Sequence, residues 1–262
     1  MLIKLIEKIG LLIEGPIAGV GRIMLLLYST IKWTFKPPFE IRNIVKQMLE
    51  IGVKSLPVVL ITAVFTGMVL ALQSYTGFKR FGAEGLVGSV VALSMTRELG
   101  PVLTAIMITA RAGSAMTAEI GILRISEQID ALYTMRIDPQ RYLISPRIAA
   151  SIISFPLLTA FFDLIGILGG YLTGVVLLGV DKGAYFYRIH SYVELVDIRG
   201  GFIKSLVFAV LVSTICCYEG YFTHLRTDSY GAKSVSLSTT SAVVLSCVMI
   251  LISDYVVTSF LM

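Results

Sequence analysis

The sequence predicts an all-α integral membrane protein, because both its composition and its long apolar stretches are typical of that class. Of the 262 residues, 56% are hydrophobic and 15% are charged, and the mean hydropathy is +0.84. Soluble domains usually contain about 45–50% apolar and about 25% charged residues. The composition therefore excludes a soluble enzyme, a disordered chain and a disulfide scaffold. We expect one membrane domain over residues 1–262, with an interfacial region at 1–54 and a transmembrane bundle at 55–262.

The N-terminal region predicts a helix that lies in the membrane surface. Between Met1 and Glu14, charged residues such as Lys4 and Glu7 follow one stripe and apolar residues fill the rest, which is an amphipathic helical pattern. The apolar run at 23–31 is too short to cross a bilayer. Glu7 and Glu14 also interrupt the apolar centre that a cleavable signal peptide needs, so we expect an interfacial helix instead.

Five apolar stretches predict five transmembrane helices, since each approaches or exceeds the ~20 residues that cross ~30 Å of hydrocarbon. The third stretch is long enough for one tilted helix or a helix with a broken turn. The expected spans cover residues 55–78, 85–122, 148–180, 201–223 and 234 to the C-terminus.

The distribution of basic residues predicts the orientation. Most lysines and arginines lie in residues 1–54 and in the loops that follow the second and fourth spans. Basic loops stay in the cytoplasm, so we expect a cytoplasmic N-terminus and, after five crossings, a C-terminus on the outer side of the membrane. The same asymmetry explains the net charge of +5 without a nucleic-acid partner.

The loop between spans two and three predicts a short amphipathic helix. Ser126 is a suitable N-cap, and Glu127 and Asp130 fall in the first turn, where the helix dipole favours acidic side chains. Apolar residues recur at helical spacing, and Pro139 follows the end. Such a helix either lies against the lipid headgroups or docks a soluble partner, and the pattern alone leaves both alternatives open.

Four short motifs in and around this loop resemble the MlaE family of ABC-transporter permeases. They are Arg97-Glu-Leu-Gly-Pro-Val-Leu103, Ala110-Arg-Ala-Gly-Ser-Ala-Met-Thr-Ala-Glu119, Glu127-Gln-Ile-Asp-Ala-Leu132 and Asp138-Pro-x-x-Tyr-Leu-x-x-Pro-Arg147. The resemblance implies a homodimeric permease that binds two copies of a cytoplasmic ABC ATPase and a periplasmic lipid-binding protein with MCE domains. It also implies that the complex moves phospholipids between the inner and outer membranes and so maintains outer-membrane lipid asymmetry. The chain would then lie in the bacterial inner membrane, with its C-terminus in the periplasm.

The same resemblance makes the loop helix the ATPase-coupling element. We expect ATP-driven motion to pass through it into the second span. Its coupling residues are then Glu127, Gln128, Ile129, Asp130, Ala131 and Leu132.

Arg97 and Glu98 are ionisable residues inside a predicted span, where charges are expensive and usually face protein, water or a transport pathway. One interpretation is a structural pairing with neighbouring helices. The other is that Arg97 binds a lipid phosphate through its planar guanidinium and that Glu98 sets the polarity of a cavity mouth. For the acyl chains, the position of the first span suggests a wall that includes Val69, Leu70 and Tyr75.

Small residues at four-residue spacing predict closely packed helix faces. These rows are Ala110, Ser114 and Ala118; Gly113, Thr117 and Gly121; and Gly166, Gly170 and Gly174. The acidic residues Asp163, Glu219 and Asp254 could form a proton relay, but hydrogen bonding within the bundle explains them more simply.

The chain contains no phosphate-binding loop of the form GxxxxGK[ST], so we expect it not to be an enzyme and to depend on a partner that uses ATP. Its two histidines and three cysteines show no metal-ligand spacing, and no metal or cofactor is expected on the chain. Two alternative functions remain at this point: an ion-coupled secondary transporter and a non-transporting membrane scaffold.

Overall fold

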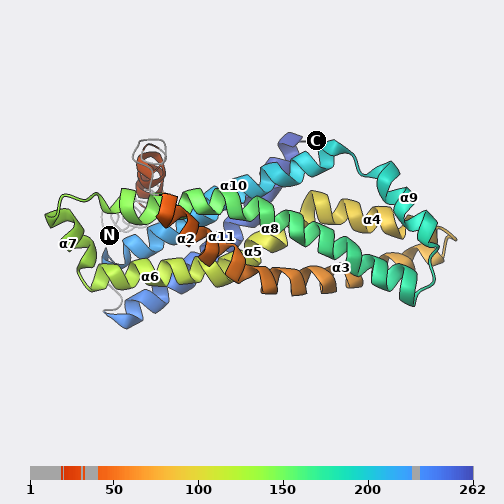
Figure 1. Ribbon diagram of the computed structural model, residues 1–262, viewed down its shortest axis with the longest axis horizontal. Helices are drawn as coiled ribbons and strands as arrows, with labels where there is room; N and C mark the ends of the chain where they lie inside the picture. The colour runs from red at the N-terminus through yellow and green to blue at the C-terminus, as the bar shows by residue number, and fades with distance from the viewer. Residues whose placement is uncertain (1–18, 20, 31, 33–40, 226–230, 262) are drawn as a thin grey trace, which may run out of the picture.

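The computed structural model describes residues 19, 21–30, 32, 41–225 and 231–261, and these residues form helices and connecting turns without a strand (Figure 1). The predicted amphipathic helix at Met1 to Glu14 lies outside the described residues. Five helical runs are long and apolar enough to cross a membrane: Ile41–Lys79, Glu84–Ile125, Gln140–Leu177, Leu195–Tyr221 and Ala232–Leu261. The predicted all-α membrane fold with five spans is confirmed.

Short irregular turns divide several of the spans. The first contains α2 (Ile41–Ile51), η1 (Val53–Ser55) and α3 (Leu56–Lys79). The second contains η2 (Glu84–Leu86), α4 (Val87–Ser94), η3 (Met95–Leu99), α5 (Gly100–Ile108), η4 (Thr109–Gly113) and α6 (Ser114–Ile125). The third contains η5 (Gln140–Ile144), α8 (Ser145–Tyr171) and η6 (Leu172–Leu177), whereas the fourth and fifth are the unbroken helices α10 (Leu195–Tyr221) and α11 (Ala232–Leu261).

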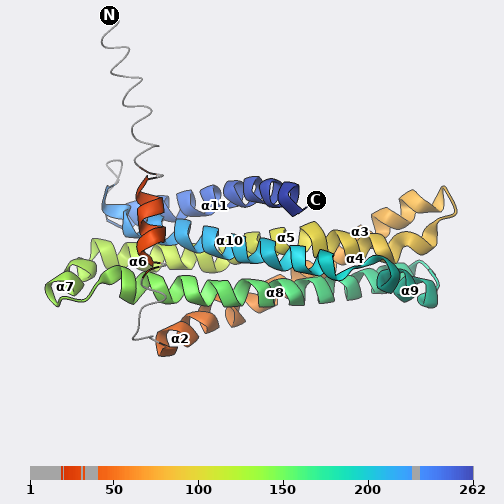
Figure 2. The same ribbon diagram turned by 90° about the horizontal axis from the view of Figure 1, so that it is seen from above.

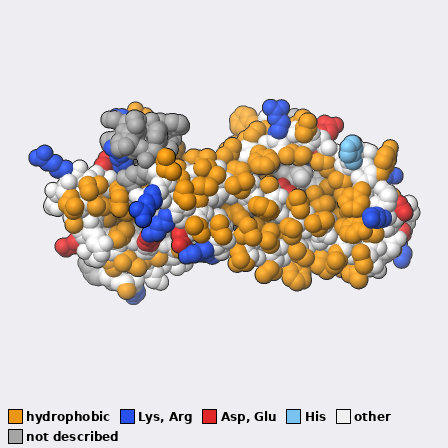
Figure 3. Space-filling view, in the orientation of Figure 1, with side chains coloured by type: hydrophobic (Ala, Val, Ile, Leu, Met, Phe, Trp, Pro, Cys, Tyr) orange, Lys and Arg blue, Asp and Glu red, His pale blue; other side chains and the backbone are white. Residues whose placement is uncertain are grey.

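The bundle is elongated, with short helices at its two ends. Figures 1 and 2 place α7 (Gln128–Thr134) at one end of the long axis and α9 (Lys182–Tyr192) at the other. The helical residues 21–30 lie near the α7 end and run across the long axis. Apolar side chains cover most of the visible face from the middle of the bundle toward the α9 end, and several charged side chains lie on the part nearer α7 (Figure 3). This distribution suits a bundle whose long axis crosses the membrane.

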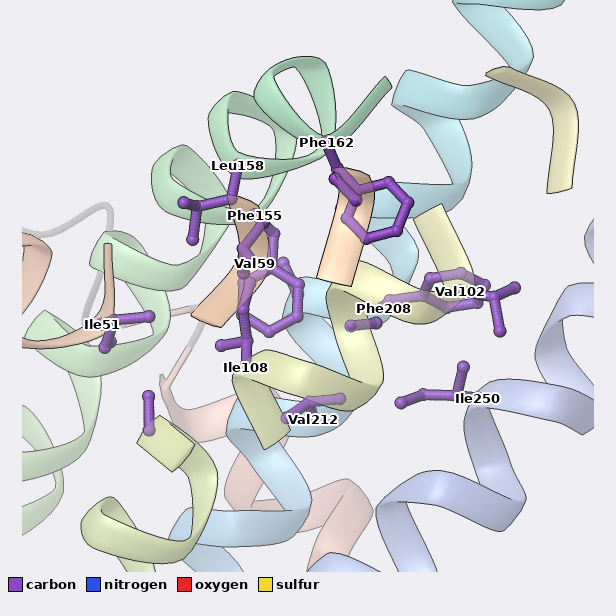
Figure 4. Packing of buried hydrophobic residues seen from close by; sticks show 14 of the residues in the cluster. Ile51, Val59, Val102, Ile108, Phe155, Leu158, Phe162, Phe208, Val212 and Ile250 are labelled. Atoms are coloured by element: carbon purple, nitrogen blue, oxygen red, sulfur yellow. The ribbon is translucent and has the colours of Figure 1, made fainter. Parts of the chain in front are cut away.

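The core forms where α3 packs against α8. Every fourth residue of α3 is buried, namely Val59, Ala63, Gly67 and Ala71. A Cβ atom on Gly67 would overlap the carbonyl oxygen of Gly166, so the two backbones can approach this closely only because residue 67 is glycine. Larger buried side chains, among them Phe155, Phe162 and Phe208, fill the space beside this contact (Figure 4).

The predicted small-residue rows differ in what they contact. Gly166 and Gly170 are buried against neighbouring helices, and Thr117 donates a hydrogen bond to the Cys216 carbonyl on α10 at 3.0 Å, which confirms close packing there. The row that starts at Ala110 does not form such a face, because Ala110 is exposed and Ser114 is half-buried. That prediction was wrong for a simple reason: four-residue spacing identifies a helix face but not the neighbour that covers it.

A bend separates α2 from α3 within the first span (Figure 1). Gly52 begins the bend, and the Arg111 guanidinium on the second span donates hydrogen bonds to the Glu50 carbonyl and to the Ser55 hydroxyl. Arg111 therefore satisfies a carbonyl that the end of α2 leaves without a helical donor.

Candidate functional site

The second span contains a π-helical bulge, η3, at the point where the sequence places its two adjacent charges. The Gly100 N–H donates to the Met95 carbonyl, which is the wider spacing of a π-turn, and Pro101 follows directly. Proline has no N–H, so the Arg97 carbonyl loses the donor that an α-helix would provide four residues later. A carbonyl freed in this way inside a membrane needs a partner from another helix.

Helix α10 approaches the bulge closely enough to provide that partner. A Cβ atom on Gly201 would overlap the Thr96 carbonyl oxygen, so only glycine permits this approach. The Lys204 ammonium then donates to the freed Arg97 carbonyl at 2.9 Å. Pro101 on the second span thus removes the helical donor to the Arg97 carbonyl, and Lys204 on the fourth span replaces it.

Three ion pairs surround this contact. Arg97 Nε lies 2.6 Å from Asp197 Oδ1, at the beginning of α10. Lys204 Nζ lies 2.5 Å from Glu98 Oε2 and 3.0 Å from Asp254 Oδ1 on α11. The cluster therefore joins three spans and combines two cations with three carboxylates, which we call the charge cluster.

The charge cluster is buried on one side and exposed on the other. The side chains of Lys204 and Asp197 are only 3% and 5% exposed, whereas those of Arg97 and Glu98 are 49% and 40% exposed. The two exposed side chains open onto a cavity of about 270 Å³ that lies between α10, α11 and the bulge. Its lining is Arg97, Glu98, Val196, Asp197, Gly200, Gly201, Lys204, Thr258 and Leu261. Such a cavity offers a guanidinium and a carboxylate beside apolar walls, so it suits an amphipathic ligand with a charged headgroup.

Arg97 and Glu98 each pair with a residue of α10, as the structural interpretation requires. Both also line the cavity, and their contact with a lipid stays a prediction. The sequence did not identify Asp197 or Lys204 as partners, and it treated Asp254 as a relay candidate. A signal was present: an isolated lysine within an apolar span requires acidic neighbours. What the sequence lacks is the pairing itself, because Arg97 and Asp197 stand 100 residues apart.

The three residues predicted for an acyl-chain wall lie on α3, away from this cavity, and none of them lines it. Val69 is 51% exposed, on the face that turns away from the core. Leu70 and Tyr75 are half-buried and pack against core residues. A contact between them and the acyl chains of a lipid stays a prediction.

Helix α7 lies where the sequence predicts a loop helix, but it begins differently. Ser126 ends α6 instead of capping α7, and its hydroxyl donates to the Ile122 carbonyl. Glu127 occupies the N-cap position with a φ of 59°, a left-handed conformation that is unusual for glutamate. The predicted serine cap was wrong because a left-handed residue is needed to turn the chain sharply from α6 into α7.

The predicted coupling residues divide into two groups on α7. Ile129 is completely buried, so it anchors the helix to the bundle. Glu127, Gln128, Asp130 and Ala131 are exposed, and Leu132 is half-buried. The exposed residues, together with Tyr133 at 53% and Met135 at 67% exposure, form a surface with apolar, acidic and amide groups.

Comparison with known proteins places this architecture in a family. The family model for Permease MlaE matches residues 44–260. A protein of Rickettsia prowazekii that is named as a probable ABC transporter permease is 45% identical over 98% of both chains. The intermembrane phospholipid transport system permease protein MlaE of Haemophilus influenzae is 39% identical over 100% of this chain and 98% of its own. The chloroplastic protein trigalactosyldiacylglycerol 1 of Arabidopsis thaliana is 38% identical over 94% of this chain and 66% of its own. The chain is thus a multi-pass membrane protein that belongs to the MlaE permease family.

Proposed function

We propose that this chain is the membrane-spanning permease subunit of an ATP-driven complex that moves phospholipids between the inner and outer membranes of a bacterium. Such transport maintains the lipid asymmetry of the outer membrane. The observation that carries the proposal is the half-exposed Arg97, held at the mouth of a cavity between three spans. The name of the Haemophilus influenzae relative, which specifies intermembrane phospholipid transport, supports the same substrate class.

In this function Arg97 binds the lipid phosphate. Its Nε is committed to Asp197, and the rest of its half-exposed guanidinium faces the cavity, where a planar fork of donors suits a phosphate. Glu98 sets the polarity of the cavity mouth. The exposed face of α3, with Val69, Leu70 and Tyr75 on or beside it, contacts the acyl chains when two copies of the chain face each other.

The energy for transport comes from a separate subunit in this proposal. A cytoplasmic ABC ATPase docks on the exposed surface of α7, and ATP is used there instead of on this chain. The α7 end then faces the cytoplasm, and the α9 end faces a periplasmic MCE-domain protein that receives or delivers the lipid. The Rickettsia prowazekii relative, which is named as a probable ABC transporter permease, supports an ATPase partner.

The lipid site is tested by substitution of Arg97 in the assembled complex, followed by mass spectrometry of copurified phospholipid and by transport in proteoliposomes. Arg97→Gln leaves the buried Asp197 carboxylate without its cation, so the double variant Arg97→Gln with Asp197→Asn is the matched control for folding. We expect both variants to lose bound phospholipid and transport, because neither has a guanidinium. A double variant that folds, binds phospholipid and transports like the unmodified complex would contradict the site.

The docking surface is tested with Gln128→Arg and Ala131→Arg together, since both side chains are exposed and no described side-chain hydrogen bond uses them. We expect the ATPase no longer to copurify. The control is Tyr187→Arg with Ser191→Arg, a pair of exposed positions on α9. Transport that continues without any bound ATPase and follows an ion gradient would instead favour a secondary transporter. Arg97 variants that change nothing would favour a scaffold.

A further inference from the structure

The chain enters α7 from α6 of the second span, but side chains on and beside α7 also contact the end of α10 in the fourth span. We infer that Arg124, Tyr133, Tyr221 and His224 form a latch that couples α7 to α10, so that ATPase motion reaches the charge cluster through α10. This inference rests on the proposed docking of an ATPase to α7. It assigns positioning roles to residues that lie outside the cavity and outside the predicted coupling segment.

The first part of the latch is a tyrosine pair. The Tyr133 hydroxyl on α7 lies 2.6 Å from the Tyr221 hydroxyl at the last residue of α10. Tyr221 is 5% exposed, and it belongs to the same buried cluster as Ile129 of α7. The hydrogen bond is therefore made at the edge of a packed apolar contact, with Tyr221 on its buried side and Tyr133 on its exposed side.

The second part is centred on Arg124, in the last turn of α6. Its Nη1 lies 2.7 Å from Asp130 Oδ1 on α7, and its Nε donates to His224 Nδ1 at 2.9 Å. The guanidinium carbon also lies 5.8 Å from the centre of the Tyr221 ring. One guanidinium thus joins α7, the end of α10 and the turn η7 (Thr223–Leu225) that follows it.

Helix α10 is the stiffer of the two routes from α7 to the charge cluster. Along span two, the bulge η4 interrupts the helix between α6 and the charge cluster, whose Arg97 and Glu98 lie in the second bulge, η3. Helix α10 continues without such a bulge from Tyr221 to Asp197, and Lys204 lies about 25 Å from Tyr221 at 1.5 Å per residue. Movement of α7 that pulls on Tyr221 therefore shifts Lys204 and Asp197 relative to Arg97 and Glu98.

The latch is tested by measuring motion at the far end of α10 in the complex of this chain with its ATPase in lipid nanodiscs. Val196→Cys provides the probe, because Val196 is 66% exposed and lines the cavity. Its labelling rate with a water-soluble maleimide is measured with and without a non-hydrolysable ATP analogue. Cys247→Ala removes the one partly exposed native cysteine, and Cys216 and Cys217 are buried.

We expect the ATP analogue to change the labelling rate, and Tyr221→Phe and Tyr133→Phe to reduce that change by about five-fold, as loss of one hydrogen bond would. Arg124→Gln should abolish the change. Tyr187→Phe, on the exposed surface of α9, is the matched control. In every variant the ATPase should still copurify and hydrolyse ATP, which a merely unfolded chain would not support.

The outcomes separate the two proposals. An ATP-dependent change that is absent in the unmodified complex, or that persists in the three latch variants, overturns the latch while the ATPase remains bound. Failure of the ATPase to copurify with the unmodified chain overturns the proposed function itself. Loss of coupling in Arg124→Gln alone, with both tyrosine variants normal, also contradicts the latch as stated.

Discussion

Lys204 is the residue on which the charge cluster depends. One ammonium group has three protons, and here it faces three acceptors: the Arg97 carbonyl, the Glu98 carboxylate and the Asp254 carboxylate. Its side chain is 3% exposed, so water cannot replace a lost partner. A buried charge needs opposite charges beside it, and Lys204 has two, although its contact with Asp254 Oδ1 is an ion pair without a hydrogen bond.

Lys204→Met should therefore destabilise the fold. It leaves two carboxylates without their cation and the Arg97 carbonyl without its Lys204 donor, and breaking a buried pair costs about 3–5 kcal/mol. Because Glu98 stays partly solvated, we expect the free energy of unfolding to fall by the lower limit of this range, about 3 kcal/mol. The measurement is the thermal unfolding midpoint in detergent, with Lys182→Met on the exposed surface of α9 as the control. An unchanged midpoint would show that the cluster contributes nothing to stability.

His224 predicts a pH dependence at the α7 end. Burial and the neighbouring Arg124 charge lower the pKa of His224 below its usual value, while Asp130 and the Tyr221 backbone oppose the shift. The unfolded chain then binds the proton more readily, so the contribution of His224 to stability is complete above about pH 6.5 and is lost as the pH falls through the lowered pKa.

We expect the unfolding midpoint to fall more steeply between pH 7 and pH 5 in the unmodified chain than in His224→Gln. The amide can still accept from Arg124 but does not titrate in this range. Parallel pH profiles for the two proteins would contradict a role of this imidazole.

Among single residues, the sequence identifies the charged side chains that matter but not their partners. Arg97 and Glu98 stand out because charge is costly in an apolar stretch. Asp197 is equally necessary to the site, yet it lies just outside the predicted fourth span and looks like an ordinary loop residue. Only the approach of α10 at Gly201 makes it a partner of Arg97.

At the scale of helices, close packing of α3 against α8 organises the core. The contact of Gly67 with Gly166 leaves no room for a side chain at residue 67. A larger residue there would have to push α3 and α8 apart. Hydropathy predicts both helices well, because each is nearly uncharged. The π-helical turns were not predicted, since they add one residue to a turn without changing its composition.

Gly67→Val should separate α3 from α8 and lower the free energy of unfolding by about 3 kcal/mol, the upper part of the usual range for overpacking. Gly77→Ala, in the same helix with open space around it, is the control and should stabilise the helix by about 0.5–1 kcal/mol. Both values follow from unfolding midpoints in one detergent. A neutral Gly67→Val would mean that the two helices separate without cost.

For the whole molecule, the arrangement of charge along the bundle determines the expected orientation. Charged loops and short helices occupy the two ends of the long axis, and apolar side chains lie between them (Figure 3). The excess of basic residues at the α7 end predicts that this end stays in the cytoplasm.

Cysteine accessibility in intact cells tests this orientation. Met135→Cys, next to α7, and Lys182→Cys, on α9, place exposed thiols at opposite ends of the bundle. A maleimide that passes the outer membrane but not the inner membrane should label only the second. Labelling of the first alone would invert the proposed topology.

The number of spans follows from the sequence because membrane thickness fixes the length of an apolar stretch. The arrangement of those spans does not follow, since apolar residues face lipid and protein with similar free energy. Contacts such as Thr117 with Cys216 depend on which helices become neighbours.

The bulge η3 beside Pro101 also makes the arrangement of span two sensitive to the loss of a single residue within it. An α-helix turns by about 100° for each residue, so deletion of one residue in η3 would convert the bulge into a regular turn and rotate α4 by that angle relative to α5. Val87 and Val91, now completely buried, would swing out of the core. A substitution within this turn keeps the residue count of the span, but deletion of a single residue would reorient half of the span at once.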